Sequence, residues 1–428
     1  MIELETPRER AILVGAPLKR LPPEEVAEHI QELARLADTA GAEVVGDLVQ
    51  RVDSPHPRLY IGEGKAAELK ELILDREATL IIFDDELSPA QGKNLEEFLG
   101  IRVMDRAELI LDIFATRART AEARLQVELA QLQYLLPRLT RMWAHLSRVR
   151  GGIGMRGPGE TQLETDRRMI NHKIGRLKED LERISRQRAT QRKSRSDIFR
   201  ASLVGYTNAG KSSLLRALSG SDVFVEDRLF ATLDATTRTV DVGDGYECLL
   251  TDTVGFIRKL PHHLVASFRA TLEEAGEADL ILHVVDSSHA GWESQMEVVD
   301  SVLDDLGLSR HPTALVFNKV DRLTHEEEEV WQARAKAFYP RESVFVSSVE
   351  PGGVEPLRML LQERIRSANS RVRITVPAAK GGILAEIYRE GEVLSRSDEE
   401  GDVILIARLP PAVLGRLRRQ PDVRITDQ

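Results

Sequence analysis

The stretch Gly205-Tyr206-Thr207-Asn208-Ala209-Gly210-Lys211-Ser212 matches the phosphate-binding pattern G-x-x-x-x-G-K-S/T. An apolar run at residues 199–204 precedes it and is typical of a buried strand, and a helical pattern begins at Ser213. Glycines allow the backbone to approach phosphates, and amide groups at a helix N-terminus attract anions. We therefore expect residues 205–213 to bind the phosphates of a nucleotide, with Lys211 as a catalytic cation and the Ser212 hydroxyl as a ligand of Mg²⁺.

Two further motifs indicate a guanine nucleotide. Asp252-Thr253-Val254-Gly255 has the form D-x-x-G, in which the aspartate would hold Mg²⁺ through water and the glycine amide, a catalytic group, would face a γ-phosphate. Asn318-Lys319-Val320-Asp321 follows an apolar strand, and the Asp321 carboxylate can accept hydrogen bonds from N1–H and N2–H₂ of guanine. Adenine lacks this donor pair and would leave a buried carboxylate unpaired, which costs several kcal/mol.

A fourth motif completes the set. Val346-Ser347-Ser348 ends another predicted strand, and its small residues can meet the guanine O6. The four motifs stand in order, each at the carboxyl end of a predicted strand, where doubly wound sheets bind nucleotides. The sequence therefore predicts an α/β, Ras-like P-loop G domain at residues 197–368 that binds GTP and GDP and hydrolyses GTP.

Composition places the chain among globular proteins of several domains. It has 428 residues, of which 30% are charged and 42% apolar, and its formal net charge is −10. Its single cysteine, Cys248, cannot form an internal disulfide, which favours a reducing compartment. No run of about 18 apolar residues is present, so we expect no membrane span. We expect a cytoplasmic monomer, with peripheral attachment to a membrane left open.

The first part of the chain, residues 1–108, alternates strand and helix patterns. These patterns cover residues 10–14, 23–40, 41–45 and 79–83. The alternation predicts a small parallel α/β domain. Within it, Tyr60-Ile61-Gly62-Glu63-Gly64-Lys65 stands before a further helix. Lys65 could contact a phosphate or RNA, but G-x-G-K alone is a weak signal, and a strand-to-helix turn is the simpler interpretation.

Residues 109–196 show a different periodicity. Two sets of apolar residues are spaced four and three apart: Leu125, Leu129, Leu132, Leu136 and Leu139, then Ile170, Ile174, Leu177, Leu181 and Ile184. Such heptad seams predict a helical hairpin with an antiparallel coiled-coil stem. Between them, Arg150 to Glu160 holds five glycines and a proline, so we expect a non-helical loop at the tip.

The hairpin is strongly basic. From Arg138 to Arg195 there are sixteen Lys or Arg and six acidic residues, a net charge of +10, so the rest of the chain carries −20. A basic arm on an acidic body is the charge distribution of a protein that contacts a phosphate backbone. The alternative is a solvated helix face packed on the acidic G domain. We expect RNA contacts near the tip, at Arg150, Gly152, Arg156, Gly157, Arg167 and Arg168.

The loop from Gly151 to Glu160, running on through Thr161-Gln162-Leu163-Glu164-Thr165-Asp166-Arg167-Arg168, resembles the signature of the HflX family of translation-factor-related GTPases. The order of N-terminal α/β domain, helical hairpin and G domain is also similar. The resemblance implies a cytosolic GTPase that binds the large ribosomal subunit and its rRNA. In bacteria it implies a factor that splits stalled or idle ribosomes under stress.

The same resemblance assigns two further sites. It identifies Phe230-Ala231-Thr232-Leu233-Asp234 as switch I, part of the GTP site, with Thr232 as a catalytic residue and the second Mg²⁺ ligand. From the residues alone, Thr236 or Thr237 would serve nearly as well. Asn208 resembles the asparagine that helps bind K⁺ in related GTPases, so K⁺ is a candidate second cofactor.

The residue after D-x-x-G bears on catalysis. Ras-like enzymes use a glutamine there to orient the attacking water. Phe256 can neither donate nor accept a hydrogen bond. We therefore expect slow hydrolysis until a partner completes the site. The alternative is that Phe256 only packs and another side chain of the domain substitutes.

Residues 369–428 alternate strand patterns with a short basic helix, which predicts a small C-terminal α+β module. We assign no functional residue there. Two other functions stay open for the whole chain. One is a GTP-gated RNA-binding or RNA-remodelling factor that acts away from the ribosome. The other is a switch that binds a protein effector, against which the basic glycine-rich tip argues.

Overall fold

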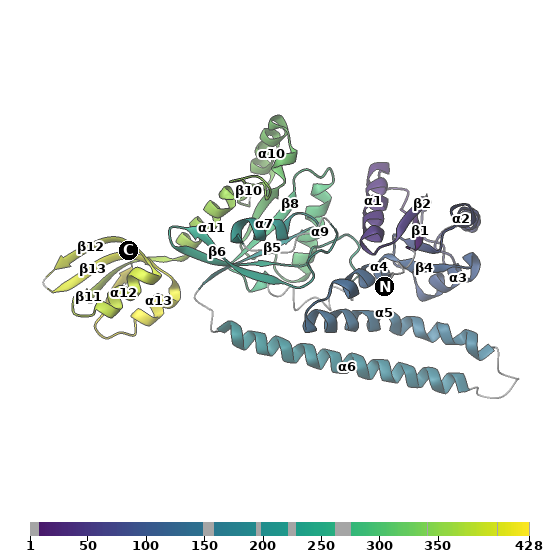
Figure 1. Ribbon diagram of the computed structural model, residues 1–428, viewed down its shortest axis with the longest axis horizontal. Helices are drawn as coiled ribbons and strands as arrows, with labels where there is room; N and C mark the ends of the chain where they lie inside the picture. Colours follow the sequence, from purple (N-terminus) through teal and green to yellow (C-terminus); the bar gives the residue numbers. More distant parts are fainter. Residues whose placement is uncertain are drawn as a thin grey trace, which may run out of the picture.

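The computed structural model describes residues 8–148, 158–193, 198–220, 228–261, 275–339, 341–399 and 401–427. Three separate sheets and one long helical hairpin organise these residues (Figure 1). The predicted multidomain α/β architecture is confirmed. Within the described ranges, no helix is both long and apolar enough to cross a membrane.

The N-terminal sheet is parallel, with the strand order β2-β1-β3-β4. Its strands and helices alternate along the chain: β1 (Arg10–Gly15), α1 (Pro23–Thr39), β2 (Glu43–Val49), α2 (Glu63–Arg76), β3 (Leu80–Phe83), α3 (Pro89–Leu99), β4 (Arg102–Asp105) and α4 (Arg106–Arg117). Helices α1 and α4 pack on one face and α2 and α3 on the other. The inner strands are apolar because both faces are covered.

Two long helices, α5 (Ala121–Arg148) and α6 (Pro158–Lys193), pack along each other as the predicted hairpin (Figure 1). The seam predicted for α6 is its least exposed face, with Leu177 buried. Helix α6 begins at Pro158, so the predicted non-helical loop is wrong for its last three residues. Proline has no amide donor and is tolerated at the first position of a helix.

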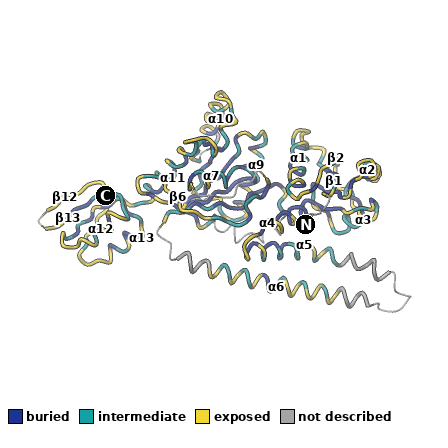
Figure 2. Tube along the Cα trace, in the orientation of Figure 1, coloured by how far each residue is buried: buried dark blue, intermediate teal, exposed yellow. Residues whose placement is uncertain are grey.

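Helix α5 carries a second apolar stripe that the heptad pattern did not reveal. Ala123, Val127, Ala130 and Tyr134 are buried in the core that α1 and α4 form on the N-terminal sheet. Apart from Leu129, the predicted leucine seam of α5 is only partly buried. Helix α5 is therefore fixed to the body, whereas the described residues of α6 are mostly exposed or intermediate (Figure 2).

The second sheet has six strands in the order β10-β9-β8-β5-β7-β6, and every pair is parallel except β6–β7. Its elements are β5 (Phe199–Gly205), α7 (Lys211–Ser219), β6 (Thr236–Gly243), β7 (Tyr246–Asp252), β8 (Leu280–Asp286), α9 (Trp292–Asp305), β9 (Thr313–Asn318), α10 (His325–Phe338), β10 (Ser343–Phe345) and α11 (Glu355–Ala368). Strands β5, β7, β9 and β10 each run into one predicted motif. Their carboxyl ends therefore bring the four motifs to one edge.

The C-terminal sheet is antiparallel, with the strand order β12-β13-β11-β14. Its elements are β11 (Ser370–Pro377), α12 (Gly381–Glu390), β12 (Glu392–Glu399), β13 (Asp402–Leu409), α13 (Pro411–Leu417) and β14 (Arg424–Asp427). Both helices pack on the same face of the sheet. The predicted α+β module is confirmed.

Candidate active site

The phosphate loop joins β5 to α7, and two of its glycines have no room for a side chain. Gly205 and Gly210 have positive φ angles of 153° and 97°. A Cβ on Gly205 would lie 2.3 Å from the Val284 carbonyl oxygen, and one on Gly210 would lie 2.1 Å from Asn318 Nδ2. Both positions therefore require glycine.

Lys211 opens α7 with its ammonium group folded back on the loop. Nζ donates hydrogen bonds to the carbonyl oxygens of Gly205 (3.1 Å) and Tyr206 (2.9 Å). Burial lowers the pKa of Lys211 to about 8, although the nearby Asp252 carboxylate opposes the shift. Phosphate oxygens are stronger partners for this cation than the two carbonyl groups. The loop therefore holds Lys211 where it can reach a bound phosphate.

Three predicted Mg²⁺ ligands lie together beside Lys211. The Ser212 hydroxyl is 2.7 Å from Thr232 Oγ1 and donates to Asp252 Oδ2 at 2.6 Å. Asp252 is fully buried, and its Oδ1 has no hydrogen-bond partner in the described part of the chain. Burial raises the pKa of this carboxyl, opposed by the Lys211 charge. An unpaired carboxylate oxygen beside two hydroxyls suits Mg²⁺, which takes its other ligands from phosphates and water.

The structure separates Thr232 from the two alternative threonines. Thr237 Oγ1 is 2.9 Å from Thr251 Oγ1, across the β6–β7 pair. Thr236 donates to the Asp234 carbonyl oxygen at 3.4 Å. Of these three threonines, Thr232 is the one bonded to Ser212. This placement favours Thr232 as the second Mg²⁺ ligand.

Hydrogen bonds connect the base-recognition motif to the phosphate loop. Asn318, buried at the end of β9, donates from Nδ2 to the Ala209 carbonyl oxygen at 2.9 Å. Lys319 Nζ donates to the Asn208 carbonyl oxygen at 2.8 Å and to Asp286 Oδ2 at 2.7 Å. The two motifs therefore hold each other in position across the sheet edge.

The carboxylate expected to read guanine is also oriented by a neighbour. Ser347 Oγ donates to Asp321 Oδ1 at 2.7 Å. Ser347 Oγ in turn accepts hydrogen bonds from the backbone amides of Val349 (3.3 Å) and Glu350 (3.2 Å). Because Asp321 lines the pocket, Ser347 fixes the direction from which its carboxylate would meet a base.

Most of the predicted GTP residues line one pocket at the carboxyl edge of the sheet. The lining includes Thr207, Asn208, Gly210, Lys211, Ser212, Ser213, Phe230, Ala231, Thr232, Thr253, Gly255, Lys319, Asp321 and Ser348. Sequence reasoning missed three further lining residues, Arg228, Arg322 and Val349. Each of the three stands within two positions of a predicted motif, so extending the motifs by two residues would have included them.

The other predicted residues do not line the pocket. Ala209, Leu233, Val254 and Val346 are buried in the cores behind it. Val320 begins the short 3₁₀ turn that carries Asp321. The side chains of Tyr206 and Asp234 bond to the N-terminal part and to the start of α5 instead.

Comparisons with known proteins agree with this geometry. Residues 200–319 match the family model described as a 50S ribosome-binding GTPase. Residues 27–115 and 117–195 match the models for the N-terminal and middle regions of GTP-binding GTPases. GTPase HflX of Flavobacterium psychrophilum is 45% identical over 384 residues, which cover 86% of this chain and 93% of the relative. GTPase HflX of Escherichia coli is 43% identical, with 92% of each chain covered.

The chain belongs to the HflX family of GTPases. Its activity is therefore the hydrolysis of GTP to GDP and phosphate. GTPases generally use Mg²⁺, and the oxygens of Ser212, Thr232 and Asp252 fit this ion. When bound, Mg²⁺ neutralises charge on the phosphates.

The segment expected to be switch I, residues 230–234, is tied to the base of the hairpin. The Asp234 carboxylate accepts hydrogen bonds from the backbone amides of Arg119 (3.1 Å) and Thr120 (3.3 Å) and from the Thr120 hydroxyl. Phe230 packs edge-to-face on Phe114 of α4, with ring centroids 4.7 Å apart. Asp234 thus acts at the N-terminus of α5, where a negative charge is stabilising.

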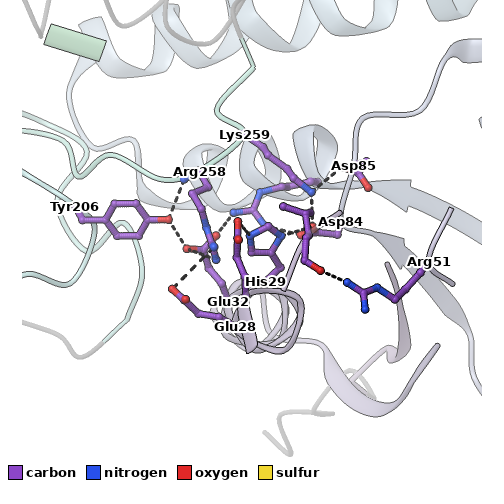
Figure 3. Close-up of polar contacts among 12 residues, drawn as sticks. Glu28, His29, Glu32, Arg51, Asp84, Asp85, Tyr206, Arg258 and Lys259 are labelled. Carbon is purple, nitrogen blue, oxygen red and sulfur yellow. Dashed lines mark hydrogen bonds and ion pairs between the residues drawn. The ribbon is translucent and has the colours of Figure 1, made fainter. Parts of the chain in front are cut away.

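A buried ionic cluster links the phosphate loop to the N-terminal part (Figure 3). The Tyr206 hydroxyl donates to Glu32 of α1 and accepts from the backbone amide of Arg258 at 2.9 Å. Burial, reinforced by the Glu32 charge, raises the pKa of Tyr206, so the hydroxyl keeps its proton. The Arg258 guanidinium lies 3.5 Å from Glu32 and 3.9 Å from Glu28. The phosphate loop and the segment after D-x-x-G therefore meet at one carboxylate.

The cluster continues toward the edge of the N-terminal sheet (Figure 3). Arg106 of α4 is buried and donates to Glu32 and, at 2.8 Å, to Asp84. Lys259 donates to Asp84 at 2.5 Å and to Asp85 at 2.6 Å. Buried charges are costly unless paired, so each member depends on the others.

Phe256 packs between the phosphate loop and this cluster. Its side chain is 2% exposed, and it is not among the described residues that line the pocket. Its amide donates to the Gly205 carbonyl oxygen at 3.1 Å, and its carbonyl accepts from the Thr207 amide at 2.7 Å. The structure thus favours a packing role for Phe256, since its side chain is buried and does not line the pocket.

The structure describes only part of the predicted RNA contact region. Arg150, Gly152, Arg156 and Gly157 lie outside the described residues, whereas Arg167 and Arg168 are exposed on α6. Lys65 lies in the first turn of α2, where its Nζ donates to Glu68 at 2.8 Å. This is an ion pair between residues three apart on the helix, and it gives no indication of a ligand at Lys65.

Replacing Asp321 by Asn tests the assignment of this residue as the guanine reader. We expect GTP affinity to fall about 10- to 100-fold, because hydrogen bonds to a charged acceptor are lost. Preference should shift to xanthosine triphosphate, since the amide can donate to the xanthine 2-oxo group. Titration with both nucleotides measures the shift, and Asp305→Asn, an exposed position on α9, is the control. Unchanged GTP affinity in Asp321→Asn would rule the assignment out.

Replacing Glu32 by Ala tests the buried cluster. We expect the free energy of unfolding to fall by about 3–5 kcal/mol, because Arg106 and Arg258 would stay buried after losing the carboxylate that they share. Urea unfolding followed by circular dichroism measures this change. The control is Glu71→Ala, an exposed residue of α2, which should alter stability by less than about 0.5 kcal/mol. Equal effects of the two substitutions would contradict the role of the cluster.

Proposed function

We propose that this HflX-family GTPase docks on the large ribosomal subunit through its basic arm and separates stalled or idle ribosomes into subunits. The observation that carries the proposal is the attachment of the expected switch I to Arg119 and Thr120, the residues just before α5, because it joins the nucleotide site to the arm. Two further findings support it. The matched model for residues 200–319 describes a 50S ribosome-binding GTPase, and Arg167 and Arg168 are exposed on α6.

In this mechanism the nucleotide sets the position of the arm. Thr232 would bind Mg²⁺ on the side of the site where the γ-phosphate lies. Asp234, two residues later, bonds to the backbone just before α5. Switch segments of GTPases are ordered by the γ-phosphate and released on hydrolysis. GTP would therefore hold the arm in its docking orientation, and hydrolysis would free it.

Three groups of the chain would carry the hydrolysis step. Lys211 would offset charge on the phosphates, and the Gly255 amide would donate to the γ-phosphate. A Cβ on Gly255 would lie 2.7 Å from Thr207 Cα, so the position has no space for a side chain. Asn208, in the left-handed region with φ of 62°, would help to hold K⁺ as a second cation. Contact with rRNA would supply the group that Phe256 does not.

The remaining expectations follow from this role. The chain would act in the cytoplasm, where ribosomes are found, and it would act as a monomer. The alternative location is the membrane surface, to which the chain would attach peripherally. The alternative function is that of a GTP-gated RNA-binding or RNA-remodelling factor that acts away from the ribosome.

Sedimentation through a sucrose gradient tests the docking step. With a non-hydrolysable GTP analogue, the full chain should travel with large subunits, and the same chain lacking residues 151–159 should stay at the top. GTP affinity should be equal in the two, because the deletion leaves the nucleotide loops intact. Binding should fall steeply with salt, as counterion release requires.

A matched charge control makes this test specific. Arg167→Gln with Arg168→Gln removes two charges from the arm, and Arg389→Gln with Arg418→Gln removes two exposed charges elsewhere. Weaker binding by the first pair alone is expected. Normal sedimentation of the tip deletion would refute docking through the arm. Absence of the full chain from the subunit fractions, with RNA binding intact, would favour the alternative function.

Catalysis gives a separate prediction. We expect slow turnover by the chain alone and an increase of at least about tenfold with large subunits, since a missing water-orienting or charge-stabilising group can be worth about 10³–10⁵-fold. Potassium should raise the rate further and sodium should not. Phosphate release at fixed ionic strength measures both effects. Fast turnover that ribosomal subunits do not change would show that the site is complete without a partner.

A further inference from the structure

The C-terminal sheet lies beyond the residues that the family models match, which end at 319. Its elements run β11-α12-β12-β13-α13-β14, with the strand order β12-β13-β11-β14. This is the split β-α-β arrangement. The four-stranded RNA-recognition motif binds RNA on the sheet face.

Helices cover one face of this sheet and leave the other open. Val372, Ile374 and Val376 of β11 alternate toward the helices and form a core with Ile387 of α12 and Leu417 of α13. The intervening positions of the strands make up the opposite face. In the described part of the chain, no helix contributes core residues to that face.

The open face carries an arginine cluster formed by Arg371, Arg373, Arg408 and Arg424. Arg371 lies directly opposite Arg408 in the β11–β13 register, and Arg424 lies opposite Thr375, the next residue along this face from Arg373. Like charges opposite each other destabilise a pair of strands. Arg371, Arg373 and Arg424 are exposed, and their side chains form no hydrogen bond or ion pair with any residue that the structure describes.

Carboxylates of the same face compensate only part of this charge. Glu392 lies 3.5 Å from Arg408 and also bonds to the Tyr246 hydroxyl and to Arg366. Glu399 and Asp402 face each other at the far end of the β12–β13 pair. Three arginines therefore remain available to an anionic ligand.

The other side chains of the face indicate which ligand this is. Hydroxyl residues surround the arginines: Thr375, Ser395, Ser397 and Thr426. The apolar residues in line with them are Pro377, Ile404, 9% exposed, and Ile406, which is half-buried; the exposed Leu394 lies at the β12 bulge, and no described residue of the face is aromatic. Protein interfaces depend on aromatic and apolar anchors, whereas guanidinium and hydroxyl groups bind phosphate oxygens and ribose hydroxyls.

We propose that this arginine face binds the phosphate backbone of RNA. Because it offers no ring for base stacking, it binds with little sequence preference. This contact is distinct from the one proposed for the arm, since it lies on the C-terminal sheet and the arm is the helical hairpin.

Fluorescence anisotropy with a single-stranded 20-nucleotide polyuridine tests the proposal. The probe is titrated with the full chain and, separately, with the chain that lacks residues 151–159, so that binding by the arm is measured on its own. In both backgrounds, Arg371→Gln, Arg373→Gln and Arg424→Gln together should lower RNA affinity at least about tenfold. The slope of log affinity against log salt should become shallower by about 2, because each lost phosphate contact on a single strand contributes about 0.7.

The matched control removes three charges from the helix side of the same module. Arg389→Gln, Arg418→Gln and Arg419→Gln should leave RNA affinity within about twofold of the parent. Replacing the three face arginines by lysine should keep most of the binding, because the charge is retained. Unfolding temperature and basal GTP hydrolysis should not fall in any variant.

Three results would overturn the proposal. Equal losses in the two glutamine triples would show a general charge effect, and unchanged binding in both would show that RNA does not use this face. The third would come from the same titration with labelled polyglutamate. If the glutamine triple on the face lost polyglutamate binding but kept its RNA affinity, the face would be assigned to an acidic protein partner. Ribosome sedimentation through the arm can succeed or fail independently of each result.

Discussion

The buried carboxylate of Glu32 is the interaction on which the arrangement of the nucleotide site depends. It stands on α1 of the N-terminal part, yet it bonds to Tyr206 of the phosphate loop and lies 3.5 Å from Arg258. Arg106 completes its surroundings. A carboxylate in this position requires these partners, because an unpaired buried charge would be too costly. The first hundred residues are therefore part of the structure that holds the GTP site.

An apolar core reinforces this connection. One cluster contains residues of α1, α4 and α5 together with Phe230 and Phe256 of the nucleotide loops. Packed cores transmit displacement because they have few voids to absorb it. Switch I is held by this core and by the start of α5. Coupling between sites is reciprocal, so an effect of GTP on the arm would be matched by an equal effect of the arm on the affinity for GTP relative to GDP.

The sequence predicted the chemistry of the site better than the directions of its side chains. Motifs such as 205–212 and 318–321 carry their own local geometry, so the strand ends and the pocket could be placed in advance. Tyr206 and Asp234 belong to these motifs, but their partners Glu32 and Thr120 are 174 and 114 positions away, and local patterns contain no information on such pairs. The second stripe of α5 was missed for the same reason, because heptad spacing shows that a face is apolar and not what it packs against.

The difference between the two hairpin helices has a mechanical consequence. Helix α5 is embedded in the body, and α6 of 36 residues extends about 54 Å at the usual rise per residue. A tilt of about 10° at the attached end would displace the far end by about 9 Å, nearly the diameter of a helix with its side chains. A small rotation where α5 is held would therefore be enlarged along the hairpin into a movement on the scale of a whole secondary-structure element.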